Sequence, residues 1–264
     1  MAFTIDHDLH CHSFLSSCSS DPEQTPRAIL DHAIACGYTV QCITDHLWDN
    51  LVPDPSGWYA PQDVEHVSKN LPLPQDDRVK MVFGCETEYC GGKKLGLDPR
   101  HYDTFDFIVI PPNHFHMKGF VRPERVDTEQ KAADLLVERL EELTLIDLPW
   151  HKVGIAHMVC GLIFSEGDER LVYELVDEAR FRAVMRKLAA LGAGIEINLA
   201  SFHDGWTADA DKYLRLYRFA KEEGCKFYLA SDAHHVHELD LVPRRAPEVI
   251  SRLGLDETHQ FHIG

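Results

Sequence analysis

Histidine and carboxylate residues gather directly after short apolar segments of this sequence. The first group is Asp8-Leu9-His10-Cys11-His12 and the last is Ser231-Asp232-Ala233-His234. The groups between them are Thr44-Asp45-His46, Gly84-Cys85-Glu86-Thr87-Glu88, Asn113-His114-Phe115-His116, Ala156-His157-Met158 and Glu196-Ile197-Asn198. Imidazole nitrogens and carboxylate oxygens bind transition-metal ions. The repeated placement of these residue types, more than the total of 17 histidines, indicates a metal centre.

The spacing of His10 and His12 has a physical reason. Residues two apart on a strand point to the same side, so both imidazoles can reach one ion from a rigid backbone. Alone, such a pair is a weak motif. Each later histidine, considered by itself, is better explained as a core or surface residue than as a metal ligand. The joint pattern favours a site, because core histidines have no reason to recur at the same end of successive strands.

Short β-branched segments alternate with longer segments of helical spacing. The predicted strands are residues 3–9, 39–44, 79–85, 105–110, 153–156, 194–199 and 226–230. The predicted helices are residues 25–37, 62–70, 129–143, 168–191 with a break near Phe181, 209–223 and 245–253. Most of residues 47–78, rich in Pro and Asp, are predicted to form a long loop. Thr25 followed by Pro26 is typical of a helix start, and Gly37 of a helix end.

Strand–helix alternation predicts a parallel sheet with right-handed crossovers. An open doubly wound sheet would spread the polar groups along a line. A closed barrel brings every carboxyl strand end to one mouth, which is where barrel active sites lie. The convergence of so many ligand types therefore favours a barrel. We expect residues 1–264 to form a single α/β domain of this kind.

Composition excludes several classes of protein. Acidic residues outnumber basic ones by 43 to 26, so the formal charge is −17, which disfavours nucleic acids and anionic membrane surfaces as partners. The first residues lack the pattern of a signal peptide, and no apolar segment reaches membrane-spanning length. Eight cysteines occur without a CxxC pair, which favours reduced thiols and a cytoplasmic location.

The ordered groups resemble the motifs of the PHP (polymerase and histidinol phosphatase) superfamily. The resemblance runs from residue 8 to residue 235 and rests on the opening DxHxH, the TDH and the terminal SDAH. It implies a distorted (β/α)7 TIM-like barrel and a histidinol-phosphatase-like phosphoesterase. It also implies two to three divalent transition-metal ions, of manganese, iron or zinc, and a small phosphorylated substrate.

Carried over by position, the resemblance implies three groups of metal ligands. The ligands are His10, His12, Glu86 and Asp232 for one ion, Glu86, His114 and His157 for a second, and His46 and His234 for a third. The third ion often takes another ligand at the position that Cys18 occupies here, with Asp21 as an alternative. His116 is the rival of His114.

Metal-activated water would suffice for phosphoester hydrolysis, and no Ser-His-Asp grouping is required. We assign catalytic roles to Glu86, Asp232 and His234. For substrate binding we select His203, Arg244 and Arg245, the last two because they follow the SDAH segment. Asp8 and Asp45 either accept hydrogen bonds from ligand imidazoles or serve as turn or cap residues. Trp48 and Trp58 either line the pocket or pack under the long loop.

Two other functions fit parts of the pattern. Amidohydrolase barrels also begin with HxH and cleave C–N or C–O bonds, but they usually carry a strand-end lysine that is not obvious here. A non-catalytic metal-binding barrel would have lost several ligands. The expected function is therefore hydrolysis of a phosphomonoester of a small metabolite. The sequence does not select a substrate, a metal or an oligomeric state.

Overall fold

The computed structural model describes residues 2–263. Met1 and Gly264, the two ends of the predicted domain, lie outside the described residues. Within that range eight parallel strands form one sheet in the order β1-β2-β4-β5-β6-β7-β8, and β3 also pairs with β4. Their bounds are β1 His7–Asp8, β2 Val40–Ile43, β3 His46–Leu47, β4 Lys80–Thr87, β5 Phe107–Ile110, β6 Val153–Ile155, β7 Gly194–Asn198 and β8 Lys226–Ala230.

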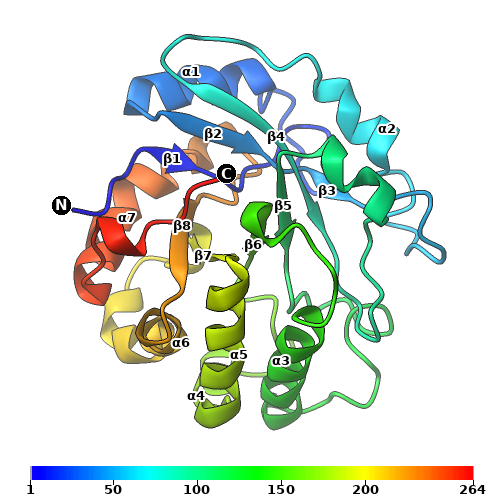
Figure 1. The fold of residues 1–264 in the computed structure, drawn as a ribbon, viewed down its shortest axis with the longest axis vertical. Helices are drawn as coiled ribbons and strands as arrows, with labels where there is room; N and C mark the ends of the chain where they lie inside the picture. Colours follow the sequence, from blue (N-terminus) through cyan, green and yellow to red (C-terminus); the bar gives the residue numbers. More distant parts are fainter. Residues whose placement is uncertain (1, 264) are drawn as a thin grey trace.

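The sheet curls until its first and last strands meet. Backbone hydrogen bonds join Leu9 N to Leu229 O at 3.0 Å and His12 N to Ala233 O at 3.0 Å. β3 continues the path of β2, since both pair with β4 on either side of the interruption at residues 44–45. The result is a nearly closed barrel of seven parallel strand positions, surrounded by helices (Figure 1). This confirms the TIM-like barrel and rejects the open sheet.

The helices lie where the spacing predicted them, with small shifts at their ends. They are α1 Pro26–Cys36, α2 Val64–Val67, α3 Glu129–Leu143, α4 Glu169–Leu175, α5 Glu178–Leu191, α6 Ala210–Glu222 and α7 Leu241–Leu253. The predicted helix 168–191 is two helices, and the break lies at Asp177, whose side chain caps α5, and not near Phe181. None of the helices within residues 2–263 has the length and apolar character that a membrane span requires.

The barrel interior is narrow, so glycine is needed opposite the aromatic side chains that fill it. Phe107 and Tyr228 meet edge to face inside it, with ring centroids 5.3 Å apart. A Cβ atom at Gly154 would lie 2.5 Å from the hydroxyl oxygen of Tyr228, and one at Gly194 would lie 2.9 Å from Phe261. Glycine is therefore required at these inward positions. Val82 on β4 and Gly194 on β7 face the barrel interior. Side chains alternate along a strand, so Glu86 and Glu196, which lie four and two residues further on, also point inward.

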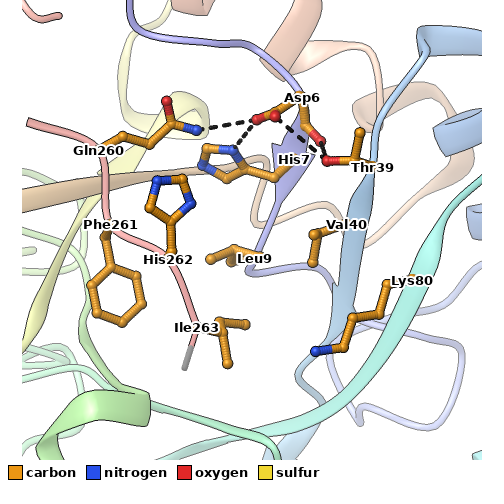
Figure 2. A pocket seen from close by; sticks show the side chains of 10 residues that line it. All are labelled: Asp6, His7, Leu9, Thr39, Val40, Lys80, Gln260, Phe261, His262 and Ile263. Carbon is orange, nitrogen blue, oxygen red and sulfur yellow. Dashed lines mark hydrogen bonds and ion pairs between the residues drawn. The ribbon is translucent and has the colours of Figure 1, made fainter. Parts of the chain in front are cut away.

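The amino-terminal mouth of the barrel is covered by the end of the chain. Phe261 N donates to Phe227 O at 2.8 Å, and the Phe261 ring lies 6.0 Å from that of Phe107. Figure 2 shows Leu9, Phe261 and Ile263 around the small pocket, of about 100 Å³, that remains there. This apolar cover belongs to the floor of the barrel, and the predicted ligands lie at the opposite mouth.

Candidate metal centre

A pocket with a volume of about 590 Å³ opens at the carboxyl ends of the strands. Seven predicted metal ligands line it, namely Cys18, His46, Glu86, His114, His157, Asp232 and His234. The other two, His10 and His12, are fully buried, and their Nε2 atoms lie within 3.4 Å of carboxylate oxygens of Glu86 and Asp232. The structure thus brings together all nine residues that were selected as ligands, from strand ends far apart in the sequence.

Two of these histidines lie close to two carboxylates. His10 Nε2 lies 3.1 Å from His12 Nε2 and 3.4 Å from Glu86 Oε2. Asp232 Oδ1 lies 3.2 Å from His12 Nε2 and 3.4 Å from His10 Nε2. Ligands of a tetrahedral zinc ion, each at about 2.0–2.1 Å, lie roughly 3.3 Å from one another. Each imidazole therefore lies at coordination spacing from the other and from both carboxylates, and the ligand atoms of His10, His12 and Glu86 all lie within 4.8 Å of one another.

Hydrogen bonds on the outer side of the two imidazoles orient them toward the two carboxylates. His10 Nδ1 lies 2.5 Å from Glu196 Oε1, an acceptor, so this nitrogen carries the proton. Ser16 Oγ donates its one hydrogen to Asp45 Oδ1 at 2.7 Å, so at 2.9 Å it accepts from His12 Nδ1. In the neutral rings both Nε2 atoms then present lone pairs to the centre.

Two facing lone pairs and two carboxylates need a cation between them. Burial lowers the pKa of His10, but Asp232, Glu86 and Glu196 outweigh it and raise that pKa well above its usual value. The pKa of His12 is well below its usual value, because it is buried and faces the charges of His234 and His46. Without metal, a proton on His10 supplies the positive charge. Protons and metal ions therefore compete for this site.

A second group contains Glu86, His114 and His157. Glu86 Oε1 lies 3.8 Å from the Nε2 atoms of both histidines, and His157 Nε2 lies 3.2 Å from Asp232 Oδ2. His114 Nδ1 contacts Glu88 Oε1 closely, so its Nε2 is free to face Glu86. His116 is exposed, whereas His114 is buried and points into the group, which favours His114 over its rival.

A third group lies closer to the mouth. His12, His46 and His234 offer ring nitrogens within 4.8 Å of one another. His234 Nδ1 donates to Asp232 O at 2.8 Å, so in the neutral ring Nε2 carries the lone pair. Burial raises the pKa of the Cys18 thiol, but hydrogen bonds with His234 and His46 outweigh it and lower that pKa to about 7. Asp21, the alternative ligand, instead accepts from Val236 N at 3.1 Å and does not line the pocket.

The residues fit a metal cluster better than a network of hydrogen bonds. Both carboxylate oxygens of Glu86 and both ring nitrogens of His157 are buried without a hydrogen-bond partner. His46 Nδ1 lies only 2.9 Å from Glu86 Oε2, yet the contact is not oriented as a hydrogen bond. Buried polar groups without partners are costly, so their lone pairs are expected to serve a common cation.

The backbone is strained at two of the same residues. His157 has φ 57° and Asp232 has φ 52°, in the left-handed region that disfavours side chains other than glycine. Two of the four such non-glycine residues among residues 2–263 are therefore candidate ligands. Strain of this kind persists where the surroundings hold it in place, and it clusters at functional sites.

Of the two roles considered for Asp8 and Asp45, the structure favours the one that fixes the backbone over the contact with an imidazole. Asp8 accepts hydrogen bonds from the backbone nitrogens of His10 and Ser231, at 3.3 and 3.0 Å. Asp45 accepts from Ser13 and Ser16 and from Asn70. Neither carboxylate has a hydrogen bond or ion pair with an imidazole, because its oxygens accept from these other donors. They fix the backbone and the serine, and the serine in turn orients the histidine.

The sequence interpretation missed the groups that do orient the imidazoles. These are Glu196, Ser16 and Glu88. Glu88 also accepts from the Tyr59 hydroxyl at 2.6 Å, so it holds the His114 ring and the long loop together. A signal for Glu196 and Glu88 was present, because carboxylates at inward strand positions of a narrow barrel need partners.

The three residues selected for substrate binding do not line the pocket. His203 Nε2 lies 2.7 Å from the Tyr213 hydroxyl, in a separate shallow depression. Arg245 donates to Leu199 O at 2.8 Å and supports the turn after β7, while Arg244 is exposed on α7. The structure therefore offers no geometric support for these three assignments.

Of the two loop tryptophans, Trp58 lines the pocket and Trp48 is buried beneath the loop.

Comparisons with known proteins agree with this geometry. No family model matches the chain. A protein of Deinococcus radiodurans named "Probable histidinol-phosphatase" is 27% identical over 258 residues, with 88% of this chain and 87% of that protein covered.

Two solved structures share the fold. One is histidinol phosphate phosphatase from Lactococcus lactis, in complex with zinc, L-histidinol and phosphate. It has a TM-score of 0.62 and 18% identity, with 97% of this chain and 98% of that chain covered. The other, from Listeria monocytogenes, has a TM-score of 0.62 and 15% identity, with 92% and 99% covered. Together with the order of the motifs, these matches confirm the predicted resemblance of the chain to the histidinol-phosphatase-like proteins of the PHP superfamily.

Proposed function

We propose that this protein is a metal-dependent phosphatase that hydrolyses a phosphomonoester of a small molecule. The observation that carries the proposal is the group formed by His10, His12 and Glu86, whose ligand atoms all lie within 4.8 Å of one another, with Asp232 Oδ1 3.2 Å from His12 Nε2. The relatives named as histidinol phosphatases support phosphomonoester chemistry. The zinc in the Lactococcus lactis structure supports divalent metal ions.

Two to three ions per chain are expected. The first would be held by His10, His12, Glu86 and Asp232, and Glu86 would extend to a second held by His114 and His157. A third would use the mouth group with Cys18. Bound divalent cations supply charge relief to the phosphoryl oxygens and acidify the attacking water.

The chain's own residues prepare the site for this chemistry. Glu196, Ser16 and Glu88 hold imidazole protons on the outer nitrogens, so that the inner nitrogens stay available. Asp232 and His234 are only partly buried and line the pocket, and we assign to them contact with the reacting phosphate and its water. The protein walls limit solvent around the phosphate, which strengthens each electrostatic contact.

The decisive experiment is turnover by protein loaded separately with zinc, manganese or iron. A panel of phosphomonoesters, phosphodiesters, amides and lactones would be assayed, and histidinol phosphate would be included because the relatives are named for it. Metal-dependent release of phosphate from monoesters, abolished by chelation and restored by metal, is the expected result. Hydrolysis of amides or lactones alone would indicate amidohydrolase chemistry. No turnover at full metal content would overturn the proposal.

A further inference from the structure

A loop of residues 48–62 follows β3 and returns to its own start. Trp48 N donates to Gln62 O at 2.8 Å, and this hydrogen bond closes the loop at its base. Trp58 and Tyr59 lie on the loop and line the pocket over the metal centre. The loop therefore forms part of the pocket wall.

Tyr59 connects this loop to the metal centre. Its side chain is fully buried, with ring centroids 4.7 Å from Trp58 and 6.1 Å from Phe120. Its hydroxyl donates to Glu88 Oε1 at 2.6 Å and also lies 3.4 Å from His46 Nδ1. The bond to Glu88 is much the shorter, so it is the main contact between the hydroxyl and the metal centre.

The Glu88 carboxylate depends on Tyr59 for its orientation. Within residues 2–263 its hydrogen-bond partners are the Tyr59 hydroxyl and His114 Nδ1, and both contact Oε1. The other oxygen, Oε2, is buried without a partner. Without the hydroxyl, the carboxylate would be held only by the histidine that it orients. Glu88 can therefore fix the ring of this candidate ligand only while Tyr59 fixes Glu88.

The first group of candidate ligands is oriented by other residues. Glu196 and Ser16 hold the outer nitrogens of the two imidazoles in that group. These two contacts involve no residue of loop 48–62. Loss of the Tyr59 hydroxyl should therefore weaken the second group, which contains His114, and leave the first group intact.

We infer that Tyr59 is a positioning residue that couples metal binding in the second group to the pocket wall formed by loop 48–62. Its hydroxyl fixes Glu88, and Glu88 holds the proton on His114 Nδ1, so that Nε2 is available to an ion. The inference rests on the proposed function, because it concerns the metal centre assigned there. Coupling acts in both directions, so an ion in the second group also stabilises the loop.

Metal affinity tests the effect of the loop on the ion. Tyr59→Phe keeps the buried ring and removes only the hydroxyl, so the ion of the second group should bind about 10–100-fold more weakly, as for other partners of ligand histidines. Competition with a chelator, followed by elemental analysis, should show this ion lost early and the ion of the first group retained as in the native protein.

Tyr213→Phe is the matched control and should bind every ion with native affinity. Tyr213 is also a buried tyrosine, and its hydroxyl lies 2.7 Å from His203 Nε2 in a separate depression. Equal affinities of all ions for native and Tyr59→Phe protein would overturn the inference.

A double-mutant cycle distinguishes positioning through Glu88 from a general loosening of the structure. If the hydroxyl acts through Glu88, Tyr59→Phe should weaken metal binding much less in a Glu88→Gln background than in the native protein. Losses of affinity that simply add would show that the hydroxyl acts elsewhere, which contradicts the inference.

Hydrogen exchange tests the effect of the ion on the loop, and its first comparison requires no variant. Zinc should slow amide exchange in residues 48–62 of the native protein, because the filled second group holds Glu88 and, through it, Tyr59. Mass spectrometry of peptides from this loop measures the protection, which should be largely lost in Tyr59→Phe. No protection in the native protein, or equal protection in both proteins, would overturn the inference.

None of these measurements uses turnover, so the inference and the proposed function can fail separately. If zinc protects the loop through Tyr59 but the loaded protein hydrolyses no phosphomonoester, the proposed function is wrong and the coupling stands. If phosphomonoesters are hydrolysed but Tyr59→Phe matches the native protein in metal affinity and hydrogen exchange, the coupling is wrong and the proposed function stands.

Discussion

The two mouths of the barrel are built from the same strands and differ in almost every other respect. At the amino-terminal mouth, Phe261 and Ile263 cover Leu9 and leave a pocket of about 100 Å³ (Figure 2). At the carboxyl-terminal mouth, a pocket of about 590 Å³ is lined by histidines and carboxylates. Apolar side chains pack against one another below the small pocket of the floor, whereas Glu86 and His157 at the top hold buried polar atoms without partners.

The difference follows from strand direction. Loops after parallel strands can carry ligand side chains without disturbing the barrel, because the interior below is already packed by Phe107 and Tyr228. Chemistry and stability are thereby separated along the barrel axis. We expect substitutions at the top to remove metal or activity with little loss of fold, and substitutions at the floor to do the reverse.

The largest effect is expected for Glu86→Gln. The amide keeps the shape but removes the charge that two candidate ion sites share, so kcat/KM should fall by about 10³-fold, the upper range for one preorganised electrostatic group. Bound metal should fall as well. Elemental analysis and phosphate release measure the two losses, and circular dichroism should remain native.

Glu65→Gln, on the exposed face of α2, is the matched control and should keep metal and turnover. Glu88 is unsuitable as a control, because it contacts His114. Native metal content in the Glu86 variant would contradict the bridging role.

At the floor, Phe261→Ala should destabilise the protein by about 3 kcal/mol, which is typical of removing a buried aromatic side chain. Phe261 is 6% exposed and packs against Phe107 and Tyr228. Urea unfolding measures the free energy, and metal content should stay native at temperatures where the variant is folded. Leu191→Ala, at an exposed position, serves as the control. If folded Phe261→Ala protein loses metal, then packing at the floor and metal binding at the top are not independent.

Glu196→Gln tests whether the top depends on groups behind the ligands. Glu196 Oε1 lies 2.5 Å from His10 Nδ1, and its other oxygen accepts from His157 N. The amide can still accept a hydrogen bond but no longer supports the ring with charge. Metal affinity should fall by about 10–100-fold, as for other partners of ligand histidines. Competition with a chelator measures it, and an affinity equal to native would show that Glu196 only packs.

Local patterns were sufficient for the barrel, and the resemblance to the PHP motifs selected residues that the structure brings together around one pocket. The helix from Pro26 to Cys36 has its predicted cap residues, and α3 begins and ends where its spacing indicated. Inward alternation also explains why Glu86 reaches the centre. These features depend on neighbours in sequence, which a single chain displays.

The roles of residues that contact distant parts of the chain could not be predicted from patterns among neighbours in the sequence. Asp45 resembled a partner of His46 by adjacency, but its side chain accepts hydrogen bonds from Ser13 and Asn70 instead. Arg245 follows the last motif, yet α7 carries it to the turn after β7. Phe261 showed no pattern at all, since its role exists only once the barrel has closed.

The smallest effect is expected at Cys18, at the outer edge of the metal group. Its thiol pKa is about 7, because hydrogen bonds with His234 and His46 outweigh burial. The thiolate is the nucleophile, so alkylation of this residue in chelated protein should accelerate as pH rises through about 7, well before an ordinary thiol reacts. A bound metal would occupy the sulfur, so alkylation should slow when the protein is loaded. Cys18→Ala should weaken one ion and leave those at His10 and Glu86. Equal rates with and without metal, measured by mass spectrometry of the alkylated peptide, would show that the metal group ends at His46 and His234.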